Sequence, residues 1–257
     1  MLNSFDSAYI IEEEIYLDDI PAILLRPTQV GDLLPTIILY HGWGSNKENQ
    51  RLRGYILSLV GYQVLIPDAI YHGKRQTIED YNVEAGRKYF WETIFNNLKE
   101  FPKILEIMEK KYRADTGRVG AIGNSMGGFT AAGIFTHNPN IKALVVLNGS
   151  CYWEDSNRVF KENLDIPYLG DEKQLELKLA KLDPMHNLNM LKDRPILLLH
   201  GDADSLVALE SQRIFYNKLV TSYQDRAKIR LIEYPKLNHF VTSNMMEESI
   251  NWFNKYL

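Results

Sequence analysis

The sequence is poor in features that mark secreted, disulfide-rich or membrane-bound proteins. It has a single cysteine, Cys151, among 257 residues, so an intramolecular disulfide is excluded and we expect a reducing, cytoplasmic environment. No apolar run approaches the roughly 18 residues that a membrane-spanning helix needs. The N-terminus has no basic stretch followed by an apolar one, so no secretory signal is predicted.

A net positive charge and common cofactor motifs are also lacking. The net charge is −4 and no Lys/Arg-rich block is present, which argues against a nucleic-acid partner. Four side chains, those of His41, Asp68, His72 and His239, could in principle converge on a metal, but no pair has a recognised ligand spacing. Neither a phosphate-binding glycine loop nor a dinucleotide fingerprint occurs, so we predict no metal and no cofactor.

What is present is ordinary for a globular protein. Hydrophobic residues make up 45% of the chain and charged residues 24%. The length suits one large α/β domain as well as two small ones, and no linker or repeat is visible. We therefore expect one domain spanning residues 1–257.

Short apolar runs alternate with amphipathic segments along most of the chain. Ala8–Tyr16 and Ile20–Arg26 flank the turn at Asp18-Asp19 and predict an antiparallel hairpin. Further strands are predicted at Pro35–Tyr40, Tyr62–Pro67, Arg118–Ile122, Ile141–Leu147, Pro195–Leu199 and Lys228–Tyr234. Helices are predicted at Ser45–Val60, Val83–Tyr112, after Gly127, at Ala208–Tyr223 and at Asn244–Tyr256. Strands alternating with helices predict an α/β fold with a mostly parallel sheet covered on both faces.

Three segments of the chain allow more detailed predictions. A capping box at Ser45 and Glu48 predicts that a helix begins at about Ser45. Pro102 is expected to kink the helix Val83–Tyr112 or to split it. The charged segment Ser150–Asn189 is too long for an ordinary loop, so we expect a lid or a surface excursion with short helices.

The run Gly123-Asn-Ser-Met-Gly127 follows an apolar strand and precedes a helical segment. This is the context of a nucleophile elbow, in which a serine at a strained turn exposes its hydroxyl and close packing requires flanking glycines. Ser125 is therefore the candidate nucleophile. The alternative is a glycine-rich turn that binds nothing or holds a phosphate.

A serine nucleophile needs a general base and a carboxylate that orients the base. The strand Ile196–His200 leads into an acidic loop with Asp202 and Asp204, and the strand before Pro235 leads into a loop with His239. Ligand crevices form at such carboxyl ends of parallel strands. We favour Asp204 as the acid, because Asp202 directly follows the strand, where carboxylates more often cap local backbone N–H groups.

His239 is favoured as the base because it follows the acidic loop in the chain. Its rivals have simpler interpretations: His41 and His200 support turns, His137 lies on the surface at a helix end, and His72 and His186 lie in loops. An oxyanion also needs two N–H donors. We expect these from Met126, which follows the nucleophile, and from Trp43 in the loop His41-Gly-Trp-Gly44.

With these motifs the chain resembles the α/β-hydrolase superfamily, most closely the small bacterial carboxylesterases of the prolyl-oligopeptidase and dienelactone-hydrolase branch. The resemblance rests on His41–Gly44, Pro67–Gly73, Gly123–Gly128, Arg194–Asp204 and Asn238-His239. It implies an α/β-hydrolase fold with an eight-stranded sheet, no cofactor, and the order serine, aspartate, histidine. The family pattern His-Gly-x-x-Asp marks Asp204 as the acid.

Two departures from these families narrow the expected activity. Dienelactone hydrolases use a cysteine nucleophile, whereas this elbow carries Ser125. Prolyl oligopeptidases carry a large propeller domain for which this chain has no room, so peptidase activity is not expected. The sequence thus predicts a serine carboxylesterase acting on small, short-chain esters, as a monomer or homodimer. The alternatives are a thioesterase, lactonase or sugar-acetate deacetylase with the same triad, or a non-catalytic binding protein on the same fold.

Overall fold

The computed structural model describes residues 7–28, 31, 33–164 and 172–257, and the strands among them form one eight-stranded sheet. The first six residues of the predicted domain and the middle of the predicted excursion (residues 165–171) lie outside the described residues. The strands are β1 (Ile10–Leu17), β2 (Ile20–Pro27), β3 (Leu34–Tyr40), β4 (Gln63–Pro67), β5 (Ala114–Asn124), β6 (Ile141–Leu147), β7 (Ile196–Gly201) and β8 (Ile229–Tyr234).

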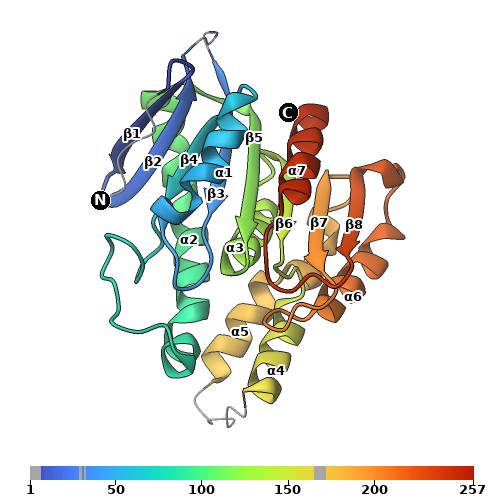
Figure 1. The fold of residues 1–257 in the computed structure, drawn as a ribbon. Helices are drawn as coiled ribbons and strands as arrows, with labels where there is room; N and C mark the ends of the chain where they lie inside the picture. The colour runs from blue at the N-terminus through green and yellow to red at the C-terminus, as the bar shows by residue number, and fades with distance from the viewer. Residues whose placement is uncertain (1–6, 29–30, 32, 165–171) are drawn as a thin grey trace.

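The strand order across the sheet is β1-β2-β4-β3-β5-β6-β7-β8 (Figure 1). β1 pairs antiparallel with β2, and β2 pairs antiparallel with β4; every later pair is parallel. The predicted N-terminal hairpin and mostly parallel sheet are confirmed. The parallel arrangement brings the carboxyl ends of β3, β5, β7 and β8 to the same edge, and the loops of the candidate site follow these four strands.

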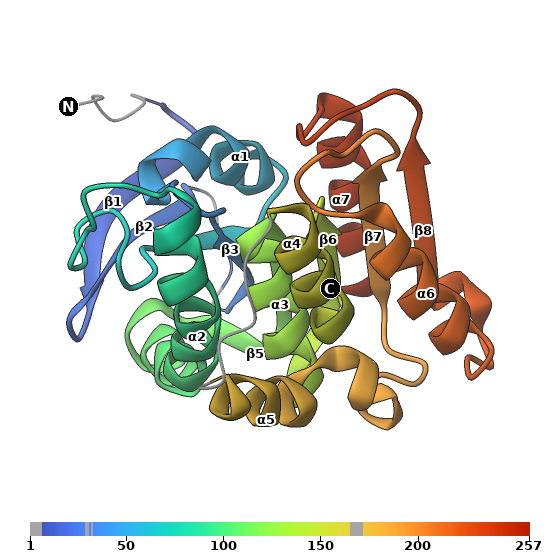
Figure 2. The same ribbon diagram turned by 90° about the horizontal axis from the view of Figure 1, so that it is seen from below.

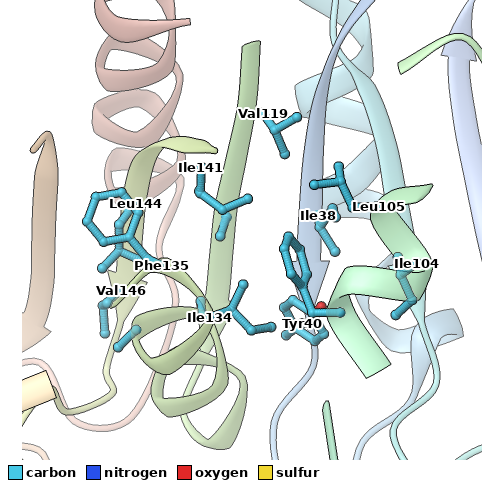
Figure 3. Packing of buried hydrophobic residues seen from close by; sticks show 14 of the residues in the cluster. Ile38, Tyr40, Ile104, Leu105, Val119, Ile134, Phe135, Ile141, Leu144 and Val146 are labelled. Atoms are coloured by element: carbon cyan, nitrogen blue, oxygen red, sulfur yellow. The ribbon is translucent and has the colours of Figure 1, made fainter. Parts of the chain in front are cut away.

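Helices cover both faces of the sheet, as the alternating pattern predicted (Figure 2). α1 (Lys47–Leu59) and α7 (Ser243–Tyr256) pack on one face, while α2 (Val83–Tyr112), α3 (Met126–His137) and α6 (Leu209–Val220) pack on the other. Because successive side chains of a strand point to opposite faces, Ile38 and Tyr40 join one core cluster and Ile37 joins the other. Figure 3 shows the first cluster, where side chains of α2 and α3 meet those of the central strands.

The structure corrects the start of one predicted helix and excludes one of the two alternatives for Pro102. α1 begins at Lys47, not at Ser45, because the Asn46 side chain caps it by accepting a hydrogen bond from the Asn49 N–H. Pro102 does not split α2, which runs through it as one helix of 30 residues. The turns around Pro102 are held by the buried side chains of Phe101 and Leu105, and this packing outweighs the lost backbone hydrogen bond.

The predicted excursion contains two short helices, α4 (Trp153–Asn163) and α5 (Lys173–Leu182), followed by the 3₁₀ turns Pro184–His186 and Leu188–Met190. In Figure 1, α4 and α5 lie below the sheet, beside the N-terminal turns of α2. A hydrogen bond from Trp91 Nε1 to Asn157 Oδ1, 2.8 Å long, joins α2 to α4. The excursion therefore packs at the same edge of the sheet as the candidate site.

Candidate active site

Ser125 occupies a strained turn between β5 and α3. Its φ of 55° and ψ of −123° lie outside the conformations that residues other than glycine commonly adopt. Its neighbours leave no space for side chains: a Cβ on Gly123 would lie 2.0 Å from the Gly127 oxygen, and one on Gly127 would lie 2.1 Å from the Tyr40 oxygen. The glycines that the motif places around Ser125 are therefore required by the close approach of β3, β5 and α3.

The loop after β3 packs directly against this turn. A Cβ on Gly42 would lie 3.4 Å from the Cβ of Ser125. The buried His41 ring holds the loop: its Nε2 accepts from the Ala69 N–H, at 3.0 Å, and its Nδ1 donates to the Gly42 carbonyl, at 2.9 Å. Burial lowers the pKa of His41, which keeps the ring neutral as this pair of bonds requires. His41 thus supports a turn, as predicted.

Asp204 and His239 meet across the loops that follow β7 and β8. His239 Nδ1 donates to Asp204 Oδ2 over 2.7 Å. The Asp204 side chain is fully buried, whereas 14% of the His239 side chain is exposed. Since Nδ1 faces the carboxylate, the free Nε2 of the imidazole is the nitrogen available to a proton donor in the cavity.

The Asp204 carboxylate is also held by its own loop. Its Oδ1 accepts from the N–H groups of Leu206 and Val207, both at 2.9 Å. Burial by itself raises the pKa of Asp204, but the hydrogen bonds from His200, His239 and the Val207 N–H outweigh it and hold the pKa well below its usual range. The carboxylate is therefore fixed in place and charged.

Asp202, the rival acid, binds backbone, as expected, although not in its own loop. Its Oδ1 accepts from the Lys236 N–H at 2.6 Å. This bond ties the loop after β7 to the loop after β8. Asp202 thus has a structural contact of its own, and no hydrogen bond to a histidine is found for it among the described residues.

His200 contacts the same carboxylate, which the sequence did not reveal. Its Nε2 lies 3.0 Å from the Val207 carbonyl and 3.2 Å from Asp204 Oδ2. Because a carbonyl can only accept, Nε2 must carry the hydrogen, and that N–H points at the acid as well. The signal for this contact is the short spacing between His200 and Asp204 within one strand-loop unit, although the sequence predicts only a turn-supporting role for His200.

Two asparagines brace the loops: Asn238 of the motif Asn238-His239, and Asn148, which the sequence did not single out. Asn238 Oδ1 accepts from the N–H groups of Ser205 and His239, at 2.9 and 2.7 Å. The buried Asn148, after β6, accepts from the Gly201 N–H and donates to the Phe240 carbonyl. The acid loop and the base loop are therefore linked to each other and to the neighbouring strand.

Ser125, His239 and Trp43 line one cavity of about 1060 Å³ at this edge of the sheet. Met126 is buried and is the first residue of α3. Its N–H is therefore one of the helix N-terminal groups without an intrahelical acceptor, where the helix dipole favours negative charge.

The Trp43 side chain belongs to an aromatic cluster beside the cavity. Its Nε1 donates to the Tyr81 carbonyl at 3.1 Å, and its ring meets the edge of the His72 ring at 5.0 Å. Burial, with a further contribution from His41, lowers the pKa of His72 to about 4, so this ring is neutral. His72, predicted to lie in a loop, is a buried packing residue there.

The residues considered as metal ligands do not form a ligand set. Asp68 is paired with the buried Lys47, at 2.8 Å, and the remaining histidines bind elsewhere: His137 donates to the Leu182 carbonyl and His186 contacts Glu154. Among the residues that the structure describes, no group of three or more His, Cys, Asp or Glu side chains is arranged to hold a metal. In the same part of the chain, no helix combines the length and apolar character that crossing a bilayer requires.

Comparison with known proteins decides the family. Residues 52–257 match the prolyl oligopeptidase family (Peptidase_S9). The chain belongs to the prolyl oligopeptidase family. This confirms the resemblance stated from the motifs.

Relatives of this family member include YitV of Bacillus subtilis, described as a candidate esterase. It is 30% identical over 235 residues, which cover 87% of this chain and 90% of YitV. The esterase YjfP of Escherichia coli is 29% identical over 251 residues, covering 94% of this chain and 97% of YjfP. Among solved structures, TT1662 from Thermus thermophilus superposes with a TM-score of 0.74 at 18% identity, covering 96% of this chain and 97% of TT1662. The structural likeness supports the predicted α/β-hydrolase fold.

Proposed function

We propose that this protein is a serine carboxylesterase that hydrolyses carboxylic esters through an acyl-enzyme intermediate. The observation that carries the proposal is the 2.7 Å hydrogen bond between His239 Nδ1 and Asp204 Oδ2, at a cavity that also holds the strained Ser125. The esterase names of YitV and YjfP, which match this chain over most of its length, support the same conclusion.

In this mechanism Ser125 attacks the ester carbonyl while His239 Nε2 takes its proton. Asp204 fixes the imidazole tautomer and stabilises the positive charge that the ring gains. His239 then returns the proton to the departing alcohol, which leaves an acyl group on Ser125. Water, activated by the same histidine, hydrolyses the acyl-enzyme and restores the free serine.

The tetrahedral intermediates carry a negative oxygen, for which we propose the backbone N–H groups of Met126 and Trp43 as donors. Met126 begins α3, so its N–H adds to the favourable end of the helix dipole. The Trp43 loop packs against Ser125 through Gly42. Removing one donor of this kind typically costs about 10²- to 10³-fold in kcat.

A fluorophosphonate probe tests the proposed nucleophile, because it reacts covalently with an activated serine. We expect stoichiometric labelling of the wild-type protein and none of Ser125→Ala, with the labelled peptide containing residue 125. Parallel assays with aryl esters, a thioester, a lactone and an acetylated sugar distinguish a carboxylesterase from a thioesterase, a lactonase and a sugar-acetate deacetylase. Absence of labelling in a folded wild-type protein would favour a non-catalytic binding protein.

A further inference from the structure

The cavity beside Ser125 is much larger than a short ester requires. Its volume of about 1060 Å³ is at the upper limit of the roughly 300–1,000 Å³ found for pockets that hold drug-sized ligands. Its wall includes residues of α2 from Val83 to Lys99, a span of about 24 Å at the helical rise per residue. An acetyl or butyryl group would occupy only the part next to the serine.

Apolar atoms provide most of the surface of this wall, and charged side chains such as Glu84, Lys99 and Lys161 also line it. On this wall Phe90 of α2 meets Phe160 of α4, with ring centroids 5.7 Å apart, and also meets Trp43 at 6.0 Å. Further apolar side chains on the wall are Tyr81, Val83, Trp91, Phe95, Leu175, Leu206 and Val207. Such a surface gains free energy when a hydrocarbon group displaces water from it.

The elements that form the wall are joined to one another. Trp91 of α2 donates a hydrogen bond to Asn157 of α4, and Lys178 Nζ of α5 lies 5.6 Å from the centre of the Phe95 ring of α2. Phe90 also packs against Phe129 of α3, at 5.6 Å. The space is thus bounded by α2, α4 and α5, which these contacts join, and α3 supports Phe90 of α2.

The position of His239 indicates which side of the ester enters this space. His239 follows β8 at one end of the sheet, whereas α2 lies on the other side of Ser125, next to β3 and β5. The alcohol oxygen must lie near His239, because that histidine returns its proton. The acyl group, attached to the opposite side of the same carbonyl carbon, then points towards α2, α4 and α5.

We propose that the cleft between α2 and the helices α4 and α5 is an acyl-binding pocket for medium-chain or arylalkyl acyl groups. This inference rests on the proposed esterase function and names the substrate class of that site. Short-chain esters still react, because they reach Ser125, but they leave most of the pocket unfilled. Each methylene that is buried there should raise kcat/KM by about three- to fourfold.

Two isomeric esters separate the acyl side from the alcohol side. Ethyl hexanoate and hexyl acetate have the same composition but carry the longer chain on opposite sides of the carbonyl. We expect the wild-type kcat/KM to be at least about tenfold higher for ethyl hexanoate than for ethyl acetate, and hexyl acetate to resemble ethyl acetate. A higher value for hexyl acetate than for ethyl hexanoate, or no effect of acyl length, overturns the acyl pocket.

Two tryptophan variants on α5 test the location. Leu175 is half-buried and lines the cavity, whereas Leu177 is 56% exposed and lies outside it. Leu175→Trp should lower the ratio of kcat/KM for ethyl hexanoate to that for ethyl acetate by about tenfold, while Leu177→Trp leaves both values and their ratio unchanged. Equal losses on both esters, or in both variants, contradict the proposal; if Leu175→Trp does not fold, the wild-type isomer comparison decides.

Fluorophosphonate labelling of the same preparations distinguishes failure of the acyl pocket from failure of the proposed esterase function. Labelled Ser125 together with no dependence on acyl length rejects the acyl pocket but keeps the esterase. An unlabelled wild-type protein that hydrolyses none of the esters rejects the esterase and the pocket together.

Discussion

The Nε2 atom of His200 lies 3.2 Å from Oδ2 of Asp204, the same carboxylate oxygen to which His239 donates. His200 is completely buried, and the Val207 carbonyl fixes its hydrogen on Nε2. The His200 imidazole therefore helps to hold Asp204 in place, while Asp204 orients the imidazole of His239. This makes His200 a positioning residue that contacts the acid and does not line the cavity.

Replacement of His200 should lower activity without removing it. In His200→Leu the acid loses one donor, and a hydrogen bond to a charged group is worth about 1.5–3 kcal/mol, so kcat should fall by roughly tenfold or more. His200→Gln can place an N–H donor near the same site and should recover most of this loss. Equal kcat values for the two variants would show that the bond to Asp204 has no role.

Asp204 and Asp202 offer a matched pair for identifying the acid. Asp204→Asn should reduce kcat on the order of 10³- to 10⁴-fold, because an amide cannot stabilise the imidazolium and favours the wrong tautomer. Asp202→Asn removes only a bond to the Lys236 N–H and should change kcat by less than about fivefold. Steady-state kinetics on one aryl ester suffices; a larger loss in the Asp202 variant would reverse the assignment.

The glycine at the first turn of α3 should be irreplaceable for the fold. A Cβ on Gly127 would lie 2.1 Å from the Tyr40 oxygen, a backbone atom, so Gly127→Ala should lower the free energy of unfolding by about 3 kcal/mol. Gly86 of α2 is the control, because a Cβ there meets nothing within 4 Å. Gly86→Ala should stabilise by about 0.5–1 kcal/mol in urea denaturation. Similar stabilities for the two variants would refute the close approach.

The buried His72 predicts a loss of stability in mild acid. Its pKa is about 4 in the folded protein, against about 6.5 in an unfolded chain, so the unfolded chain binds the proton first as the pH falls. Stability should therefore fall between pH 6.5 and 4, by up to about 3 kcal/mol. The buried His41, whose pKa is also lowered, acts in the same direction.

His72→Asn isolates this contribution. The asparagine amide can still donate to the Ile70 carbonyl, which His72 Nδ1 contacts at 2.9 Å, but it does not titrate. The free energy of unfolding of the variant should depend less on pH between 6.5 and 4 than that of the wild type. Parallel curves for the two proteins would contradict a neutral, buried His72.

The parts of the fold that the sequence predicts are those carried by local patterns. The buried strand Ile141–Leu147 reads as one apolar run and is β6 as predicted. The boundary of α1 was misplaced because both Ser45 and Asn46 are good capping residues, and only the tertiary position of the loop selects Asn46. The continuity of α2 through Pro102 depends on core packing, which a local rule for proline does not contain.

In the candidate site, too, local sequence patterns predict some contacts, whereas others depend on tertiary packing. The bond between Asp204 and His239 follows from two strand-end loops that the sequence places at one edge of the sheet. The contacts of His200 and Asn148 were missed, because they join residues through the sheet order and through side-chain direction, which spacing along the chain does not give. The size of the cavity was also not predictable, since it depends on how α4 and α5 pack against α2.

The assignment of Ser125 as the nucleophile can be checked by measuring the kcat of Ser125→Ala on an aryl ester, with thermal unfolding as the check on folding. We expect kcat to fall by at least about 10⁴-fold and the unfolding temperature to stay unchanged, because the attacking oxygen is gone while the strained turn and its glycines remain. A folded Ser125→Ala protein that turns over the ester at the wild-type rate would contradict this assignment.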